Sequence, residues 1–529
     1  MGVVLQIGGA VLPRVYWVIF VLLELGAIAV FWCFDAQPFM DFPGHAGVMA
    51  LRQRYWGSLV LQRDYVVTLN LGGYPLYRLV SDGLAGLIGP VATMRAISTF
   101  PVVALPLAMH YARRRLYQDD SALFLFVTLV LSFGYMTQMG LTPFLVAFPV
   151  VIWALTDWLI YLEKCSTGPV ALRREAGVAA LVLMVGVMHA YAFAVLSVIM
   201  LMTAASRRPL WRYLICLRVL APALFFVLFT AWLAKSTNLP PQAVAQVVPF
   251  GAIYGSLLDK LGLLITPFLA TRTGIDAAIG VAIWAAAVTG MVATLRRKSS
   301  SIAVPLRNAC IALMVGFAVL PHRVRSFDFV DSRLLPIILL AAFMAIDGKA
   351  ITPRWRRHTT MAAATAATTV VGLQLFAMQT FQGEAAGFHA VVGQMPAGRR
   401  MLYLPVQADS RIFISHPFVH YDKLAFVERG VLPSQFHFHH ASGIFPTRNN
   451  PILRLPHDYV ESDLKSIAWP HYDLAEWDFV MIRTFPDAPA PAVPEALALM
   501  DHRGGWWLYR SAAAAGELAA QPRRMDPEG

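Results

Sequence analysis

Residues 15–34 read VYWVIFVLLELGAIAVFWCF and residues 35–45 read DAQPFMDFPGH, so a long apolar run gives way at residue 35 to a stretch that contains charged and polar residues. The first stretch is apolar apart from one glutamate, and about 20 apolar residues are enough to cross a bilayer. The second stretch brings Asp35 and Asp41 to the point where the chain leaves the membrane. Carboxylates at a membrane–water boundary are well placed for general-base chemistry on a molecule whose other half lies in lipid.

The composition is typical of a membrane protein. Hydrophobic residues make up 57% of the chain, charged residues make up 14%, and the mean hydropathy is +0.58. Soluble domains carry roughly 25% charged residues. The net charge is +12, but the basic residues fall in short clusters between apolar runs, as membrane topology requires. The sequence contains no basic stripe with interleaved aromatic residues, so we do not expect a nucleic-acid partner.

The apolar runs predict a polytopic α-helical protein with about eleven transmembrane helices. The predicted ranges are 15–34, 94–112, 121–138, 141–161, 176–189, 190–204, 213–234, 276–295, 304–320, 333–348 and 359–378. The combined run 176–204 is too long for one ordinary helix, and basic residues flank both of its ends. We therefore predict a tight hairpin that turns near His189 and returns the chain to the same side of the membrane.

The distribution of basic residues predicts the orientation. With a cytoplasmic N-terminus, the cytoplasmic segments hold 17 Lys and Arg in 64 residues, whereas the outer segments 35–93, 235–275 and 321–332 hold 9 in 112. This asymmetry follows the positive-inside rule. We predict a transmembrane domain over residues 1–378, whose long first extracytoplasmic loop covers 35–93, and an extracytoplasmic domain over residues 379–529.

The C-terminal part contains no apolar run long enough for a membrane helix. It holds nine of the fourteen histidines and many prolines. Strand-like runs occur at 400–405, 478–483 and 505–510, and residues 494–502 are a helix candidate. These patterns predict a small soluble α/β domain at the outer face of the membrane.

In this arrangement the chain resembles the GT-C superfamily of integral-membrane glycosyltransferases, which use polyprenyl-phosphate sugars. The first outer loop opens with Asp35 and Asp41, and two amphipathic segments, 47–56 and 74–87, follow as candidate juxtamembrane helices. Residues 331–336 (DSRLLP) are similar to the start of the family's late helices, and a soluble outer domain closes the chain. No single subfamily is identified, because the acidic residues are not adjacent and the Trp-Trp-Asp-Gly signature of the oligosaccharyltransferases is absent.

The resemblance implies an inverting glycosyltransferase of the bacterial inner (cytoplasmic) membrane. Its partners are a polyprenyl-phosphate-linked sugar donor, the surrounding membrane lipid, and an envelope lipid, glycan or protein as acceptor. Such an enzyme needs a base for the acceptor proton, for which Asp41 and Asp35 are the candidates. It also needs positive charge at the leaving phosphate, and arginine offers a bidentate fork. The candidate phosphate ligands are Arg333, at the outer start of a predicted span, with Arg325 and Arg323 in the loop before it.

Each candidate also has a purely structural interpretation. Asp41 begins a turn or caps the helix that runs to residue 56, and Arg333 is equally well explained as a membrane anchor. His45 lies four residues after Asp41, on the same helix face, where it could assist the base, bind a divalent cation (Mg²⁺ or Mn²⁺) or simply lie at the surface. We expect Arg52 and Arg54 at the lipid headgroups.

Other classes remain open at this level. A non-catalytic membrane component, or a transporter or polymerase of a surface-polysaccharide assembly system, would also carry many membrane helices. The sequence shows no half-to-half repeat of the kind that many transporters have. His437 and His439 alternate in a histidine-rich segment, but no third ligand follows at a recognisable metal-binding spacing.

Overall fold

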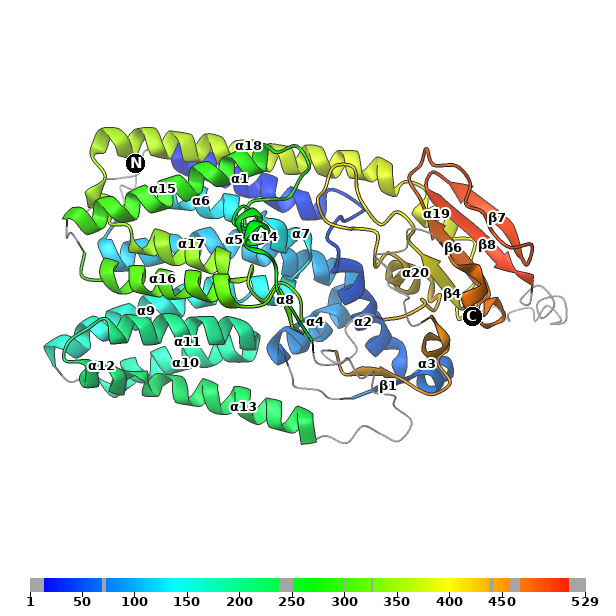
Figure 1. Cartoon of the computed structure of the whole chain (residues 1–529), viewed down its shortest axis with the longest axis horizontal. Coiled ribbons are helices and arrows are strands. Elements are labelled where there is room, and N and C mark those ends of the chain that lie inside the picture. The colour runs from blue at the N-terminus through cyan, green and yellow to red at the C-terminus, as the bar shows by residue number, and fades with distance from the viewer. Residues whose placement is uncertain are drawn as a thin grey trace, which may run out of the picture.

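The computed structural model describes residues 14–68, 73–168, 170–236, 251–297, 300–324, 327–436, 442–456 and 467–512. Its long axis runs along a bundle of helices, and a mixed helix-and-sheet part sits on one end of that bundle (Figure 1). Helices α1 and α18, coloured blue and yellow-green, both run toward this end. The first loop and the C-terminal part of the chain therefore lie on the same side of the bundle.

A helix occupies each of the eleven predicted ranges. The main helices are α1 (Arg14–Trp32), α5 (Pro90–Tyr117), α6 (Leu123–Leu131), α9 (Phe148–Thr167), α10 (Leu172–Met188), α11 (Ala190–Ala205), α13 (Ala221–Ser236), α15 (Ile275–Arg297), α16 (Ala303–Val319), α17 (Leu334–Ala345) and α18 (Pro353–Ala385). Short helical segments between them are α7 (Tyr135–Gln138), α8 (Thr142–Leu145), α12 (Leu210–Cys216), η1 (Leu217–Leu220), α14 (Leu257–Leu263) and η2 (Gly348–Ala350).

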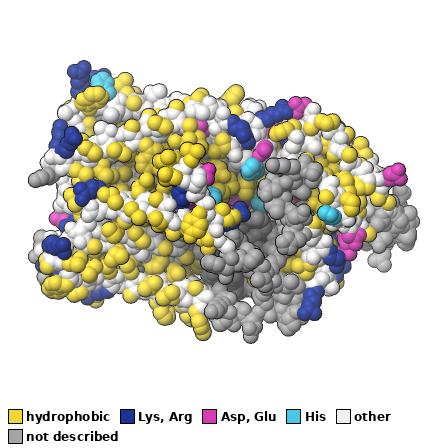
Figure 2. Space-filling model, in the orientation of Figure 1, with side chains coloured by type: hydrophobic (Ala, Val, Ile, Leu, Met, Phe, Trp, Pro, Cys, Tyr) yellow, Lys and Arg dark blue, Asp and Glu magenta, His cyan; other side chains and the backbone are white. Residues whose placement is uncertain are grey.

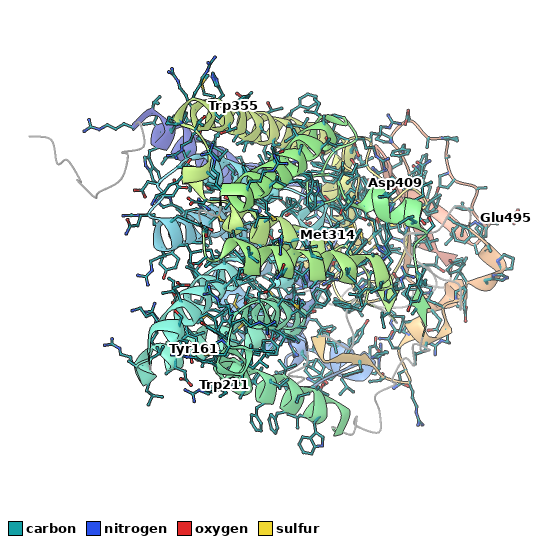
Figure 3. All side chains as sticks on the ribbon, turned by 60° about the vertical axis from the view of Figure 1, so that its left-hand side comes forward. Tyr161, Trp211, Met314, Trp355, Asp409 and Glu495 are labelled. Carbon is teal, nitrogen blue, oxygen red and sulfur yellow. The ribbon has the colours of Figure 1, made fainter. Side chains whose placement is uncertain are left out.

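Length and composition mark the bundle as the membrane part. Within the described residues, six helical segments are long and apolar enough to cross a bilayer, and three shorter apolar helices accompany them. The chain is therefore an integral membrane protein, while the number of eleven spans stays a prediction. Figure 2 shows hydrophobic side chains covering much of the bundle, with basic side chains at the end away from the C-terminal part and others near the junction and on the C-terminal part. Trp211 and Trp355, whose side chains are exposed, lie toward the end of the bundle away from the C-terminal part (Figure 3), as interfacial aromatic residues do.

The predicted hairpin is confirmed. Helix α10 ends at Met188, α11 begins at Ala190, and His189 between them has an extended backbone with φ −161° and ψ 113°. One extended residue breaks the helical hydrogen bonding, so the chain reverses there. The ring of His189 is buried and faces the interior of the molecule.

The part beyond the bundle combines the first loop with the C-terminal region. The first loop supplies α2 (Phe42–Tyr55), α3 (Leu59–Asp64), β1 (Tyr65–Val67) and α4 (Pro75–Ile88). The C-terminal region supplies α19 (Phe388–Val392), β4 (Met401–Leu404), α20 (Asp422–Arg429), β5 (Ile444–Pro446), η3 (Pro451–Arg454), η4 (Trp469–His471), η5 (Leu474–Glu476), β6 (Phe479–Arg483), β7 (Leu497–Arg503) and β8 (Trp506–Ser511). Four of the strands form a sheet in the order β4-β6-β8-β7, in which β4 and β6 are parallel and the other pairs antiparallel.

The three predicted strands are confirmed as β4, β6 and β8, but the predicted helix at 494–502 is wrong. Residues 497–502 of that range belong to β7, which pairs with β8 through the two-residue turn at Gly504 and Gly505. Gly504 has φ +57°, the left-handed conformation that such tight hairpins require. The ladder to β8 satisfies the backbone of β7, so tertiary pairing outweighs the local helical tendency.

The first loop and the C-terminal region share one core. Strand β1 pairs antiparallel with β5, with Tyr65 opposite Pro446. Helix α2 packs on α20 so closely that a Cβ on Gly47 would lie 2.8 Å from Cβ of Lys423. Apolar side chains of both segments form a joint cluster, to which Leu51 and Phe426 belong. The two parts of the chain are therefore interlocked above the bundle.

Candidate active site

Asp41 lies in the N-cap position of α2, yet its carboxylate makes no capping hydrogen bond. The residue is 6% exposed, and its backbone N–H donates to the carbonyl of Met139 at 3.2 Å. The neighbouring Gly140 has φ +72°, and a Cβ there would lie within 3.1 Å of the backbone nitrogen and Cα of Asp41. The turn at 138–140 therefore fixes the backbone of Asp41, while its carboxylate is left for other partners.

The C-terminal region supplies one such partner, His420. Its Nε2 lies 3.6 Å from Oδ1 of Asp41, and both side chains are buried. The segment around His420 is tied to the chain just before Asp41: the hydroxyl of Tyr421 donates to the carbonyl of Gln37 at 3.2 Å, and the hydroxyl of Ser415 donates to that of Pro38 at 3.4 Å. The first loop and the C-terminal region thus build the surroundings of Asp41 together. Sequence reasoning missed His420, because no local pattern links it to Asp41.

The electrostatics of this cluster favour a proton acceptor. Burial raises the pKa of Asp41 to about 7, a rise that the charge of Arg333 opposes and that of Asp328 adds to. His45 stands one turn further along α2, where burial and the nearby His420 lower its pKa to about 3. His45 is therefore neutral, and its ring packs edge-on against Tyr77 at 5.4 Å between centroids.

Arg333 directly precedes α17 and is 6% exposed. Its guanidinium carbon lies 4.2 Å from the ring centroid of Phe327 and 5.5 Å from that of Phe144. Within the described part of the chain, its hydrogen bonding consists of one bond, from Nε to the carbonyl of Asp328 at 3.2 Å. The two terminal nitrogens, which can grip an oxyanion in bidentate fashion, are thus available to a ligand.

A buried ion pair holds the loop that carries Arg333. The ammonium of Lys260 donates to the carboxylate of Asp331 at 2.7 Å and to the carbonyls of Phe317 and Leu320 at 2.8 and 2.6 Å. The second oxygen of Asp331 lies 2.9 Å from Nδ1 of His322. Two short strands, β2 (Ala252–Ile253) and β3 (Arg323–Val324), pair beside this network. The loop is therefore anchored from α14 as well as from its own two ends.

The remaining predicted residues lie elsewhere. Asp35 is exposed at the end of α1, where its backbone carbonyl accepts a bond from Arg95 at 3.3 Å. Arg323 is exposed and ion-paired with Asp328, and Arg325 is outside the described residues. The structure brings Asp41 and His45 together with His420 in one buried cluster, and it buries Arg333 separately at the start of α17.

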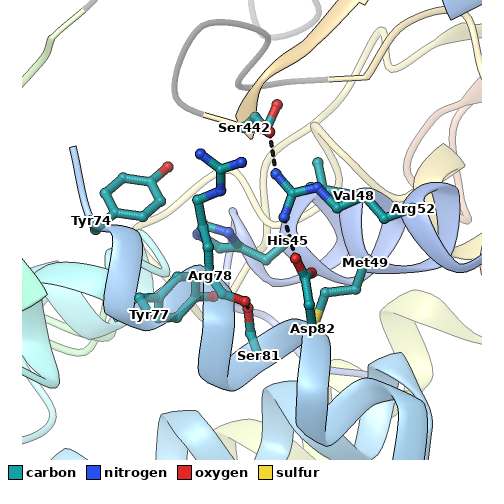
Figure 4. A pocket seen from close by; sticks show the side chains of 10 residues that line it. All are labelled: His45, Val48, Met49, Arg52, Tyr74, Tyr77, Arg78, Ser81, Asp82 and Ser442. Atoms are coloured by element: carbon teal, nitrogen blue, oxygen red, sulfur yellow. Dashed lines mark hydrogen bonds and ion pairs between the residues drawn. The ribbon is translucent and has the colours of Figure 1, made fainter. Parts of the chain in front are cut away.

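A small pocket with a volume of about 20 Å³ opens beside His45, between α2 and α4. Figure 4 shows the side chains that line it, among them Arg52 and Arg78. Nη1 of Arg52 lies 2.6 Å from Oδ2 of Asp82, and its other terminal nitrogen donates to the carbonyl of Ser442. The expectation that Arg52 lies at the lipid headgroups is therefore wrong: this arginine binds the protein, because the first loop folds under the C-terminal region.

Arg54, which we also expected at the headgroups, is exposed but bonded to the C-terminal region. Its Nη2 donates to the carbonyl of Val427 at 2.7 Å, and its other terminal nitrogen donates to that of Phe426. These two carbonyls belong to the last turn of α20. Arg54 therefore fastens α2 to the C-terminal region.

Aromatic rings connect the pocket with Arg333. The ring of Tyr74 stacks on His189 at 6.0 Å between centroids, and His189 meets Phe144 at 5.3 Å. Phe144 in turn lies under the guanidinium of Arg333 and against the ring of Tyr191 at 5.8 Å. A continuous aromatic wall therefore runs from the pocket between α2 and α4 to the start of α17.

The donor set for a metal ion is incomplete in the part of the chain that the structure describes. No group of three or more His, Cys, Asp or Glu side chains gathers there in a way that could hold an ion. The histidine-rich segment with His437 and His439 lies outside the described residues.

The fold is that of a polytopic membrane protein with a mixed helix-and-sheet part at one end of its bundle. The structure is similar to that of ArnT from Cupriavidus metallidurans bound to undecaprenyl phosphate, with 12% identity, a TM-score of 0.55, and coverage of 94% of this chain and 98% of that one. The apo structure of the same ArnT gives 12% identity, a TM-score of 0.56 and coverage of 95% and 98%. The arabinofuranosyltransferase AftD from Mycobacteria gives 13% identity, a TM-score of 0.53 and coverage of 95% of this chain but 40% of that one.

Comparison with protein-family models gave no match, and comparison with curated proteins gave none either. The predicted resemblance to the GT-C superfamily is confirmed at the level of the fold.

Proposed function

We propose that this protein is an inverting glycosyltransferase, which moves a sugar from a polyprenyl-phosphate donor to an envelope lipid, glycan or protein. The observation that carries the proposal is that a buried carboxylate, Asp41, and a buried guanidinium, Arg333, stand where the first loop and α17 meet the end of a membrane bundle with the GT-C fold. ArnT, a structure with this fold, binds undecaprenyl phosphate, which supports a polyprenyl-phosphate ligand here as well.

In the proposed reaction, Asp41 accepts the proton of the acceptor hydroxyl or amine while that atom attacks the anomeric carbon. The bond from the anomeric carbon to the phosphate oxygen breaks, and its electron pair leaves with the polyprenyl phosphate. A single displacement of this kind inverts the configuration. A base works best when its pKa is near the working pH, and burial brings Asp41 to about 7. His420 is the proposed positioning residue for this carboxylate.

Arg333 is the proposed ligand of the donor phosphate. A leaving phosphate gains negative charge as the bond breaks, and a preorganised guanidinium stabilises that charge best in a site shielded from water. The terminal nitrogens of Arg333 are available, and its position directly before a membrane helix matches the depth of a lipid phosphate. Arg323 and Arg325 are proposed to add positive charge from the same loop.

The proposed orientation has the N-terminus in the cytoplasm and the C-terminal region in the periplasm. The charge asymmetry between the two sides supports it. Reporter fusions at Arg115, Arg207 and Arg510 are expected to report inside, inside and outside. An inside signal at Arg510 would contradict both the orientation and the proposed place of the reaction.

The proposed mechanism contains no step through a metal ion. The described residues around Asp41 include carboxylate and imidazole groups, but no set of three that would hold Mg²⁺ or Mn²⁺. Transfer is therefore expected to continue in EDTA. A loss that added Mg²⁺ or Mn²⁺ restores would contradict this part of the proposal.

The proposed function is tested with purified full-length protein in lipid nanodiscs. Asp41→Asn is expected to lower transfer of sugar from polyprenyl-phosphate donors by about 10²–10⁴-fold, the usual effect of losing a general base. Affinity for undecaprenyl phosphate should not change, because Arg333 is intact. Asp35→Asn is the matched control and should retain transfer, since Asp35 is exposed. Full transfer in both single variants and in the double variant would overturn the proposal and favour a non-catalytic membrane component, a transporter or a polymerase.

A further inference from the structure

We propose that Cys165 and Cys216 form a dithiol site, which peroxide converts into a disulfide that fastens α12 to α9. The two residues are 51 positions apart in the sequence, yet Sγ of Cys216 lies 3.1 Å from Sγ of Cys165. Figure 1 places α12 at the end of the bundle away from the C-terminal part, and hence away from Asp41. The inference therefore does not rest on the proposed function.

The two sulfur atoms approach more closely than these thiols approach oxygen atoms elsewhere in the bundle. Cys216 also donates to the carbonyl of Arg212 at 3.4 Å, and Cys310 donates to that of Ile338 at 3.7 Å. Sulfur is a larger atom than oxygen, so a sulfur–sulfur distance of 3.1 Å is short by comparison. Because a disulfide bond is about 2.05 Å long, the two sulfurs need to approach by only about 1 Å to form one.

The fold brings the two thiols together from separate elements. Cys165 lies in the last turn of α9, and Cys216 is the last residue of α12, which belongs to the connection between α11 and α13. An ion pair fixes this connection against α9, because Nη1 of Arg207 lies 2.9 Å from Oε2 of Glu163. The thiols are therefore held side by side by the packing of the bundle and by a neighbouring polar contact.

The other two cysteines provide a comparison within the same chain. The structure describes all four cysteines, and Cys165 and Cys216 are the pair among them whose thiols meet. Cys33 is exposed just after α1, whereas Cys310 is buried within α16. Cys165 is 7% exposed and Cys216 is 5% exposed, so a small oxidant reaches them more readily than a bulky reagent does.

The proposed oxidation balances with hydrogen peroxide as the oxidant. One thiolate attacks an oxygen of the peroxide, the oxygen–oxygen bond breaks, and a sulfenic acid forms as hydroxide leaves. The second thiol attacks the sulfur of the sulfenic acid, so that a sulfur–sulfur bond forms and the sulfur–oxygen bond breaks with release of water. In sum, two thiols and one peroxide give one disulfide and two water molecules, and the two electrons lost by the sulfurs are gained by the peroxide.

The disulfide would close a loop that contains α10 and α11. A cross-link of this kind limits the local opening of the segments that it joins, here the end of α9 and the connection from α11 to α13. In the proposed orientation the pair lies at the cytoplasmic side, where cellular reductants keep thiols reduced. The cross-link is therefore expected to form on exposure to an oxidant and to be reversible.

The test uses the full-length protein in nanodiscs, with hydrogen peroxide as the probe. The dose is raised until the exposed Cys33 is oxidised, so that the supply of oxidant is known to be sufficient. The protein is then denatured in excess N-ethylmaleimide and digested, and its cysteine peptides are identified by mass spectrometry. We expect most molecules to contain one pair of peptides joined through Cys165 and Cys216, which dithiothreitol separates.

Three cysteine variants assign the cross-link. Cys165→Ser and Cys216→Ser each leave one thiol without its neighbour, so the joined peptides should be absent from both. Cys310→Ser is the matched control, since it removes a buried thiol elsewhere in the bundle and should leave the cross-link unchanged. Free thiols at Cys165 and Cys216 in wild type, after Cys33 is oxidised, would overturn the inference. So would sulfinic or sulfonic acids at these two positions in place of the disulfide.

The fastening of α12 has a measurement of its own. Trypsin cuts after Arg212 only when α12 opens, so oxidised protein should be cut there at least threefold more slowly than reduced protein. Cys216→Ser should remove this difference. Cleavage after the exposed Arg429, at the end of α20, is the internal control and should not depend on oxidation. Equal cleavage after Arg212 in oxidised and reduced wild type would show that the disulfide does not fasten α12.

Discussion

Nε2 of His420 lies 3.6 Å from Oδ1 of Asp41, and neither side chain reaches the solvent to any extent. One residue comes from the first loop and the other from the C-terminal region, so the contact joins the two parts of the chain at the candidate base. An imidazole at this distance restricts the rotation of the carboxylate. It also supplies a second titratable group beside the one proposed to take the proton.

The first prediction concerns His420. His420→Ala is expected to lower the transfer rate by up to about 10²-fold, because a misplaced catalytic group costs that much. His420→Gln should recover part of the rate, since an amide can still restrict the carboxylate. Affinity for undecaprenyl phosphate should stay constant, and the pH at which activity declines should move. The matched control is His416→Ala, which changes a half-exposed histidine on the same segment; a loss as large there as at His420 would point to folding and not to positioning.

The second prediction concerns pH. Burial holds the pKa of Asp41 at about 7, so the carboxylate is mostly protonated below that value. The rate constant at low substrate should therefore fall about tenfold per pH unit on the acid side of pH 7 and level off above it. A pH–rate profile measures this directly. A profile that stays flat down to pH 5 would mean that Asp41 is not the group that takes the proton.

The raised pKa of Asp41 also affects the free energy of unfolding. It makes the protein less stable as the pH rises, whereas most carboxylates make a protein more stable as the pH rises. The folded state prefers the protonated form of Asp41, whereas the same carboxyl in the unfolded chain has a pKa of about 3.9. Ionisation therefore costs folding free energy between about pH 4 and pH 7. The melting temperature of Asp41→Asn should match wild type at pH 4 and exceed it increasingly up to pH 7. An advantage that is the same at both pH values would show that the charge is not responsible.

The third prediction concerns Gly140. Its φ of +72° and the close approach of Asp41 leave no room for a side chain. Gly140→Ala is expected to shift the backbone of Asp41 and to lower the transfer rate by more than the loss of stability explains. The control is Gly177→Ala, at a helical position where a Cβ meets nothing within 4 Å. Similar rates for wild type and Gly140→Ala would mean that the turn tolerates the change without moving the carboxylate.

The fourth prediction concerns Arg333 and the ion pair that anchors its loop. Arg333→Lys keeps the charge but loses the bidentate fork, so it should weaken undecaprenyl phosphate binding more than the exposed control Arg429→Lys does. Asp331→Asn should weaken the same binding indirectly, since it leaves Lys260 buried with an unpaired charge. Affinities are measured in nanodiscs by competition. Equal affinity in wild type, Arg333→Lys and Arg333→Ala would reduce Arg333 to a membrane anchor.

The bundle was predictable because its signals are local. A membrane helix is a long apolar run, and the hairpin at His189 follows from a run too long for one helix with basic residues at both ends. Segments 47–56 and 74–87 are helical as predicted, in α2 and α4 apart from one end residue each, while their place in the membrane interface stays a prediction. Residues 494–502 were assigned wrongly, because the strand conformation of β7 depends on its partner β8 and not on its own seven residues.

The candidate site was only half predictable. Asp41 and Arg333 stand out in the sequence because they mark the places where the chain leaves and re-enters the membrane. His420 and Gly140 carry no such mark, since their importance comes from contacts with a segment far away in the sequence. Arg52 was misplaced for the same reason: its contact with Ser442 exists only because the first loop lies beneath the C-terminal region.

The pairing of β1 with β5 also bears on how the protein is made. Tyr65 emerges from the ribosome about 380 residues before its partner Pro446. At 5–20 residues per second, that interval is about 20–80 s. During this time the bundle can insert while Asp41 still lacks His420, so the growing chain passes through a stage with its membrane helices in place and its candidate site unassembled. The candidate site is thus completed close to the end of synthesis, and a chain that stopped before residue 420 would carry Asp41 without its histidine neighbour.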